Sequence, residues 1–142
     1  MTPFLFLIPL LPLLGTVATF NVLTIGSAVV TAHAMFVLAH FRTGDPGAAW
    51  IGGLLFGFSP FMMARSTEHF SLVMAAPLPL FAWVMYGVSE RPTPRRAAAA
   101  GAIVAWAYLC DPYYAVFCIL MACFSYAYTL VWLERRPLTD VP

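Results

Sequence analysis

Long apolar runs alternate with short polar interruptions along the chain. A membrane-spanning helix needs about 20 mainly apolar residues, with a range of about 17 to 25. The pattern predicts five spanning helices, the fourth of which is near the short limit, at residues 20–41, 48–64, 70–88, 97–110 and 115–133. The predicted fold class is therefore all-α, a polytopic transmembrane helix bundle that forms a single domain over residues 1–142.

The first apolar run, residues 3–15 (PFLFLIPLLPLLG), is too short to be a sixth regular span. Its thirteen residues cover roughly 20 Å as a helix, less than the hydrocarbon core. Pro3, Pro9 and Pro12 also remove backbone donors. We expect an interfacial or re-entrant segment here, with a kinked sixth span as the alternative. A basic leader and a cleavage site are absent from the pattern, so a cleaved signal peptide is not predicted.

Composition identifies lipid as the solvent of these runs. Hydrophobic residues make up 62% of the chain and charged residues only 9%, against about 25% charged in soluble domains. The net charge of +1 gives no basic surface for nucleic acid. The three cysteines lie in or beside apolar runs, so they predict neither a disulfide framework nor a zinc or other metal site; they are Cys110, Cys118 and Cys123.

The arginines are distributed unequally between the predicted loops. If the helices alternate in direction, residues 42–47, 89–96 and the C-terminal tail lie on one side, and residues 65–69 and 111–114 on the other. The first side then holds six of the seven arginines, namely Arg42, Arg91, Arg95, Arg96, Arg135 and Arg136. The positive-inside rule places that side in the cytoplasm and the other in the periplasm.

A polar segment, RSTEH, separates the second predicted span from the third. Arg65, Glu68 and His69 stand at the mouth of a helical hairpin. Arginine binds phosphate groups well, so these side chains are candidates for contact with a lipid headgroup or substrate. The alternative is a solvated turn whose charges mark the membrane edge.

The second polar interruption, DPYY, is predicted to lie on the same membrane face. Asp111 precedes Pro112, a pattern typical of a helix start, and its carboxylate is expected to cap the last helix. A contact with substrate is the alternative for Asp111. Tyr113 and Tyr114 are expected at interface depth, where aromatic rings with a polar tip are favoured, and they are the remaining candidates for headgroup contact.

His33 lies near the middle of the first predicted span, where an ionisable group is costly and indicates a function. An imidazole could provide one axial ligand to a tetrapyrrole metal. A hydrogen bond from His33 to another helix, with His40 at the interface, is the expectation that we prefer.

Small residues recur on two predicted helices, at Gly52, Gly53 and Gly57 and again from Ala97 to Gly101. Such faces allow close helix approach, either within the bundle or against a partner. Pro77 and Pro79 are expected to kink the third span.

An ordered series of short motifs runs through the chain. An Asn-led helix precedes a small-residue helix ending in Phe-Ser-Pro, a turn with a His, and a helix carrying Pro-Leu. The matching residues are Asn21, Phe58-Ser59-Pro60, His69 and Pro79-Leu80, and the later LCDPYYAVF, residues 109–117, is similar to a Tyr-Tyr turn. Over roughly residues 1–133 this series resembles the middle of bacterial polytopic membrane proteins of the GT-C glycosyltransferase type.

The resemblance implies a bacterial inner-membrane location and sugar transfer from a polyprenyl-phosphate donor on the outer face. The catalytic acid of such enzymes sits in the first external loop, and residues 1–19 contain no Asp or Glu to match it. We therefore expect a non-catalytic accessory or structural subunit without a cofactor, whose partners are the lipid bilayer and other membrane helices. The alternative is a fragment of an active glycosyltransferase whose catalytic acid lies upstream. A tetrapyrrole-binding subunit that uses His33 is the weaker alternative.

Overall fold

The computed structural model describes the backbone of residues 8–9, 11–68 and 70–135, and their side chains except at 67–68, 70 and 132–135. In these ranges the regular elements are all helical, which confirms the predicted fold class. The elements are α1 (Leu11–Thr43), α2 (Pro46–Gly57), α3 (Pro60–Glu68), the 3₁₀ helix η2 (Phe70–Val73), α4 (Pro77–Glu90), α5 (Pro94–Cys110) and α6 (Pro112–Arg135).

Helix α1 begins nine residues before the predicted start of the first span at residue 20. Its first turn contains Pro12 and is separated from the rest by Gly15, whose φ of 74° and ψ of 169° are not helical. Glycine adopts this positive φ without the cost that a Cβ would add. The turn at residues 11–14 thus belongs to a kinked α1. Residues 1–7 and 10 lie outside the described residues, so the interfacial or re-entrant placement of this segment stays a prediction.

The second predicted span, residues 48–64, contains two helices, within the stretch Pro46–Ser66 that is long and apolar enough to cross a membrane. Helix α2 ends at Gly57, and α3 begins at Pro60. Proline lacks the N–H that would continue the helix, and it disfavours helical geometry at the preceding residue, Ser59. The start of α2 is set by Asp45, whose side chain accepts a hydrogen bond of 2.8 Å from the Gly47 N–H.

The third predicted span, residues 70–88, is also interrupted. It starts as η2, leaves helical geometry after Val73, and resumes as α4 at Pro77. Sequence reasoning predicted a kink at Pro77 and Pro79, whereas the structure places both prolines in the first turn of α4. A missing N–H has no cost in a first helical turn, because that N–H has no partner within the helix.

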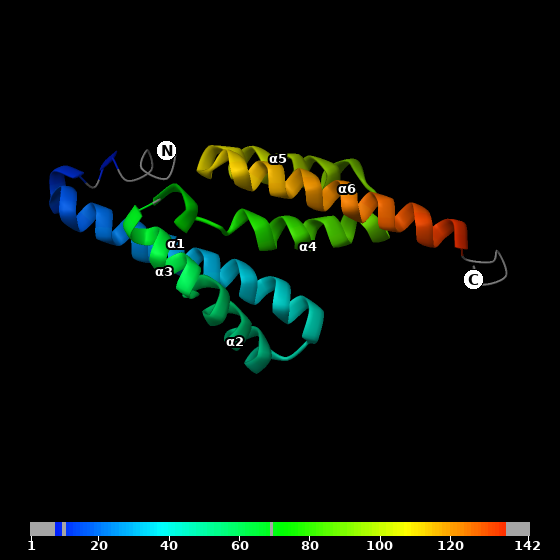
Figure 1. Cartoon of the computed structure of the whole chain (residues 1–142), viewed down its shortest axis with the longest axis horizontal. Coiled ribbons are helices and arrows are strands. Elements are labelled where there is room, and N and C mark those ends of the chain that lie inside the picture. Colours follow the sequence, from blue (N-terminus) through cyan, green and yellow to red (C-terminus); the bar gives the residue numbers. More distant parts are fainter. Residues whose placement is uncertain (1–7, 10, 69, 136–142) are drawn as a thin grey trace.

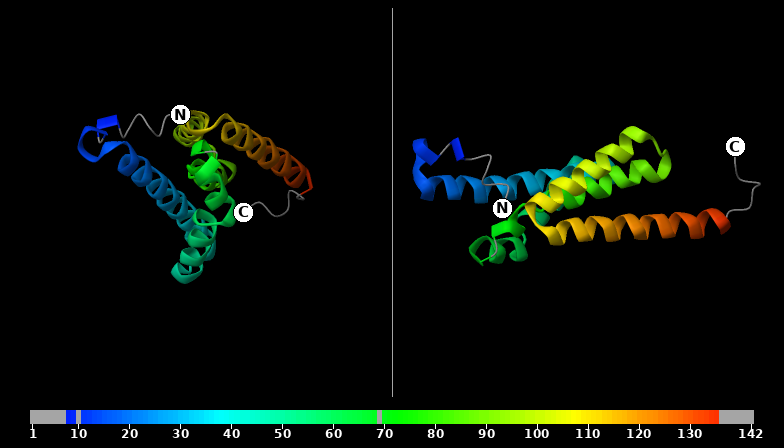
Figure 2. Two further views of the ribbon diagram at one scale, coloured as in Figure 1. Left: turned by 60° about the vertical axis from the view of Figure 1, so that its left-hand side comes forward. Right: turned by 90° about the horizontal axis from the view of Figure 1, so that it is seen from above.

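Helix α4 lies at the centre of the arrangement, where it contacts α1, α5 and α6, while α2 packs along α1 (Figure 1). Figure 2 shows α5 and α6 joined by a tight turn at the end of the hairpin they form. The buried core lies where η2, α4, α5 and α6 meet, and its most enclosed side chains include Val73, Phe81, Ala107 and Cys118.

Among the residues that the structure describes, four stretches are long and apolar enough to cross a membrane: Leu11–Thr43, Pro46–Ser66, Ser71–Glu90 and Pro112–Val131. Helix α5 has 17 residues, at the lower limit for a span, so a fifth span stays a prediction. Apolar side chains remain widely uncovered, and only 17% of the most apolar stretch of α6 is buried. Phe124 on α6, for example, is 74% exposed. Exposed apolar surface of this extent suits hydrocarbon as the surrounding medium.

The helix ends gather in two groups, as the predicted alternation of directions requires. The C-terminal ends of α1 and α4 meet where the rings of Phe41 and Tyr86 lie 5.3 Å apart. The other group joins η2 to the α5–α6 turn through a 2.7 Å hydrogen bond between Ser71 and Asp111. We call the first group the arginine end and the second the Asp111 end. The compartment that each end faces stays a prediction.

Candidate functional site

Asp111 anchors the junction between α5 and α6 and is only 8% exposed. Its Oδ1 accepts a hydrogen bond of 3.0 Å from the Tyr113 N–H, so the expected capping of the last helix is confirmed. Its Oδ2 accepts a bond of 2.7 Å from the Ser71 hydroxyl, forty residues earlier in the sequence. Both carboxylate oxygens therefore hold elements of the fold together.

The two tyrosines of the DPYY segment have different environments. Tyr113 is 69% exposed, in keeping with an interfacial ring. Tyr114 is 3% exposed and belongs to the core, where its hydroxyl donates a hydrogen bond to the Leu72 carbonyl. Tyr114 is therefore covered by η2, whereas Tyr113 is not, and the interface depth expected of both rings stays a prediction.

Thr31 on α1 completes this junction, and sequence reasoning missed it. Its side chain is fully buried, and its hydroxyl donates to the Val73 carbonyl (3.3 Å) and accepts from the Ala75 N–H (3.1 Å). The spacing of these residues was visible in the sequence. Four buried residues of α1 follow one another at intervals of four and form one packed face of the helix, namely Thr19, Leu23, Ser27 and Thr31.

The described part of the RSTEH segment belongs to α3, which packs against η2 of this junction. Arg65 lies on α3, half-buried, with its guanidinium carbon 5.3 Å from the centre of the Phe61 ring. Helix α3 packs against η2, whose Leu72 carbonyl accepts from the Tyr114 hydroxyl. Glu68 is the last residue of α3, but its side chain is not described, and His69 lies outside the described residues. The structure thus brings Arg65 to the Asp111 end and leaves the predicted roles of Glu68 and His69 as predictions.

His33 faces outward from α1 and does not make the hydrogen bond expected of it with any described residue. It stacks at 6.0 Å on Phe36, which in turn stacks at 5.8 Å on His40. His33 and Phe36 line a cavity of about 330 Å³ between α1 and α2, together with Trp50. No three His, Cys, Asp or Glu side chains in the described part of the chain are placed to share a metal ion. Ligation of a tetrapyrrole by His33 stays a prediction.

The small residues of α2 face α1. A Cβ added to Gly53 would lie 2.7 Å from the Ala32 carbonyl oxygen, and one added to Gly57 would lie 2.5 Å from the Ala32 Cβ. Such distances show that the α1 backbone occupies this face of α2. Gly101 on α5, in contrast, has open space around it. Of the two predicted small-residue faces, the one on α2 is therefore used within the bundle.

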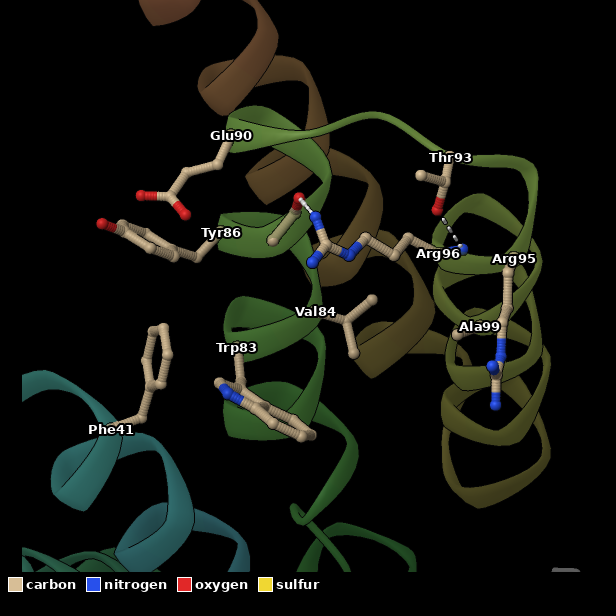
Figure 3. A pocket seen from close by; sticks show the side chains of 10 residues that line it. Phe41, Trp83, Val84, Tyr86, Glu90, Thr93, Arg95, Arg96 and Ala99 are labelled. Carbon is tan, nitrogen blue, oxygen red and sulfur yellow. Dashed lines mark hydrogen bonds between the residues drawn. The ribbon is translucent and has the colours of Figure 1, made fainter.

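A second cavity, of about 550 Å³, opens at the arginine end around α4, with α5 on one side and Phe41 of α1 on the other (Figure 3). Its walls combine aromatic and aliphatic side chains with arginines. Trp83 and Val84 come from α4, and Arg95 and Arg96 from the first turn of α5. Sequence reasoning assigned these arginines only to membrane orientation, because it could not show that they share a cavity.

The fold and these sites define a class: an all-helical protein whose long apolar helices suit a multi-pass membrane protein. No family model, curated protein or solved structure matches the chain. The GT-C resemblance therefore stays a prediction from the sequence motifs.

Proposed function

We propose that this chain is a structural or accessory helix bundle of the membrane, non-catalytic alone, which packs against other membrane helices. The observation that carries the proposal is the hydrogen bonding of the Asp111 carboxylate. Both of its oxygens accept hydrogen bonds that tie η2 and α6 together. A carboxylate held in this way serves the fold, and moving a proton onto it would disrupt the contacts that position it.

The uncovered faces support a packing role. Helix α6 is the least covered of the long apolar helices, and its outer face carries Leu120 (58% exposed) and Phe124 (74% exposed). In lipid, helices associate through close packing and not through exclusion from water. A broad apolar face of this kind therefore suits contact with a neighbouring helix.

Photo-crosslinking tests this packing role. We would replace Phe124 with a photo-crosslinking amino acid and irradiate native membranes that contain the full chain. The matched control is the same replacement at Cys118, which lies on α6 but is fully buried. Position 124 should crosslink to a defined membrane polypeptide, and position 118 should not. Crosslinks from position 124 to lipid alone would refute the accessory role.

Asp111→Asn tests the structural role of the carboxylate. Asparagine keeps one acceptor oxygen for the Tyr113 N–H, and its NH2 group can donate to the Ser71 hydroxyl in place of the bond to a charged oxygen. The bundle should therefore lose about 1 kcal/mol of stability while remaining folded. The measurement is unfolding in mixed micelles, alongside a sugar-transfer assay with a polyprenyl-phosphate-linked sugar. Transfer by the unchanged chain that disappears in a folded Asp111→Asn variant would contradict the proposal.

A second candidate function is sugar transfer from a lipid-phosphate donor, as the GT-C resemblance implies. One specific observation favours it: Arg65 lies on α3, which packs against η2, and η2 bonds to Asp111 and Tyr114. Arg65→Ala should leave the fold intact and weaken the binding of polyprenyl phosphate. Titration of the reconstituted protein measures this, with Arg42→Ala at the opposite end as control. Equal affinity in the Arg65 variant and the unchanged chain would exclude a phosphate contact there.

A further inference from the structure

The cavity at the arginine end has the composition of a binding site for an anionic lipid headgroup. Trp83, Val84 and Ala99 provide an apolar wall, and Arg95 and Arg96 provide positive charge (Figure 3). Basic pockets between transmembrane helices at the membrane surface bind lipid phosphates. Aromatic rings such as Trp83 are favoured at the same depth.

Arg96 is fixed in place by the backbone of the α4–α5 connection. Its Nη1 donates to the Gly87 carbonyl (2.7 Å) and to the Arg91 carbonyl (2.9 Å). A guanidinium has five N–H donors, of which Nη1 carries two. The Nε and Nη2 donors of Arg96 make no hydrogen bond or ion pair with any described residue.

The unpaired edge of Arg96 faces the cavity. Figure 3 shows the Nε–Nη2 side of the guanidinium turned away from the Gly87 carbonyl, toward Val84. Two parallel N–H donors of this kind match two oxygens of a phosphate. Because the carbonyl contacts already hold the side chain, binding would order few additional rotamers.

Charge at this end favours an anion. Arg95 lines the same cavity, and Arg42 at the end of α1 lies 4.9 Å from the Tyr86 ring. The one carboxylate among the lining residues is Glu90, and Figure 3 shows it beside Tyr86, on the opposite side of α4 from Arg96. An anion next to Arg96 is therefore separated from Glu90 by the helix.

We propose that this cavity binds the phosphodiester group of an anionic phospholipid, with the Nε–Nη2 edge of Arg96 as a bidentate contact and Arg95 as a second charge. The apolar wall formed by Trp83, Val84 and Ala99 accommodates the first carbons of the lipid chains. This site lies at the opposite end of the bundle from Arg65, so it is independent of both candidate functions described above.

The test compares lipid retention by the full chain in nanodiscs of phosphatidylcholine with and without phosphatidylglycerol, measured by native mass spectrometry. The unchanged chain should retain phosphatidylglycerol preferentially. Arg96→Lys keeps the charge but loses the two-point contact, and Arg95→Gln removes one charge without touching the carbonyl contacts. Each should reduce the preference by about tenfold, as expected for a charge-assisted hydrogen bond. Arg91→Gln is the matched control, because its side chain does not line the cavity.

The outcomes separate a built site from general surface charge. A preference lost in the Arg95 and Arg96 variants but kept in Arg91→Gln supports the proposal. An equal loss in Arg91→Gln, or no preference in the unchanged chain, overturns it. Inorganic phosphate is the second probe: binding of phosphate to the detergent-solubilised chain, dependent on the same two arginines but without any lipid preference, would also overturn the lipid assignment. If Arg96→Lys fails to fold, Arg95→Gln and Arg91→Gln still decide the result.

Discussion

Replacing Gly57 with alanine tests the close contact between α2 and α1. An alanine Cβ at this position would lie 2.5 Å from the Ala32 Cβ and 2.8 Å from the Ala28 carbonyl oxygen. Neither neighbour can rotate away, because one is a Cβ and the other belongs to the backbone of α1. The two helices must therefore separate or shift along one another to accept the methyl group.

The expected cost is that of overpacking, about 1–3 kcal/mol. Alanine has the better helix propensity, by up to about 1 kcal/mol in a helix interior. Gly57 is the last residue of α2, where this gain is smaller. We therefore expect Gly57→Ala to lower the free energy of unfolding by about 1–2 kcal/mol.

The assay is reversible unfolding in mixed micelles with increasing SDS, followed by circular dichroism. Gly101→Ala is the matched control, because a Cβ at Gly101 meets nothing within 4 Å. That variant should be as stable as the unchanged chain, or more stable by up to about 1 kcal/mol. If both variants lose the same stability, or if Gly57→Ala loses none, close packing of α2 against α1 is refuted.

Two further changes test the buried polar contacts. Thr31→Val keeps the shape but removes the hydroxyl that accepts from the Ala75 N–H, which then keeps only its 3.1 Å bond to the Val73 carbonyl. The expected cost is that of one hydrogen bond, about 1 kcal/mol. Faster hydrogen exchange at Ala75 should show the loss, and Thr31→Ser should restore protection. Tyr114→Phe removes the bond to the Leu72 carbonyl and should lower stability in the same micelle assay by about 1 kcal/mol. Tyr113→Phe, at an exposed ring, should be neutral, and an equal loss in both tyrosine variants would count against a specific role for Tyr114.

Local sequence signals predicted that the fold is all-helical, and they also predicted where α6 begins. Apolar runs separated by polar turns indicate helices in lipid whatever their later packing. The Asp-Pro pair at residues 111–112 marked the start of α6 because capping depends only on neighbouring residues. The meeting of the two polar interruptions at one end followed from the alternation of the helices, and the bond between Ser71 and Asp111 agrees with it.

Hydropathy alone could not predict where the backbone leaves helical geometry inside the second and third predicted spans. Hydropathy measures the preference of a side chain for lipid, and the residues around Ser59 and from Met74 to Ala76 differ little from helical neighbours in that respect. The backbone leaves helical geometry there because Pro60 and Pro77 cannot continue an incoming helix. Proline was recognised as a cause of kinks, but whether it kinks a helix or starts a new one depends on packing.

The same interruption explains why an apolar chain buries a threonine and a tyrosine. Between η2 and α4 the helical ladder stops, which leaves backbone groups that lipid cannot satisfy. Thr31 bonds to the Val73 carbonyl and the Ala75 N–H, and Tyr114 bonds to the Leu72 carbonyl. At the Asp111 end, the hydroxyl groups of Thr31 and Tyr114 thus form hydrogen bonds with backbone groups.

The arginine end differs in this respect. Arg96 also bonds to backbone carbonyls, but only through Nη1, and the rest of its guanidinium has no partner among the described residues. Donors that remain unpaired beside an apolar wall are available to a ligand, whereas donors and acceptors that complete a broken helix are not. By this reasoning the arginine end, and not the more polar Asp111 end, has the greater capacity to recognise an anionic group.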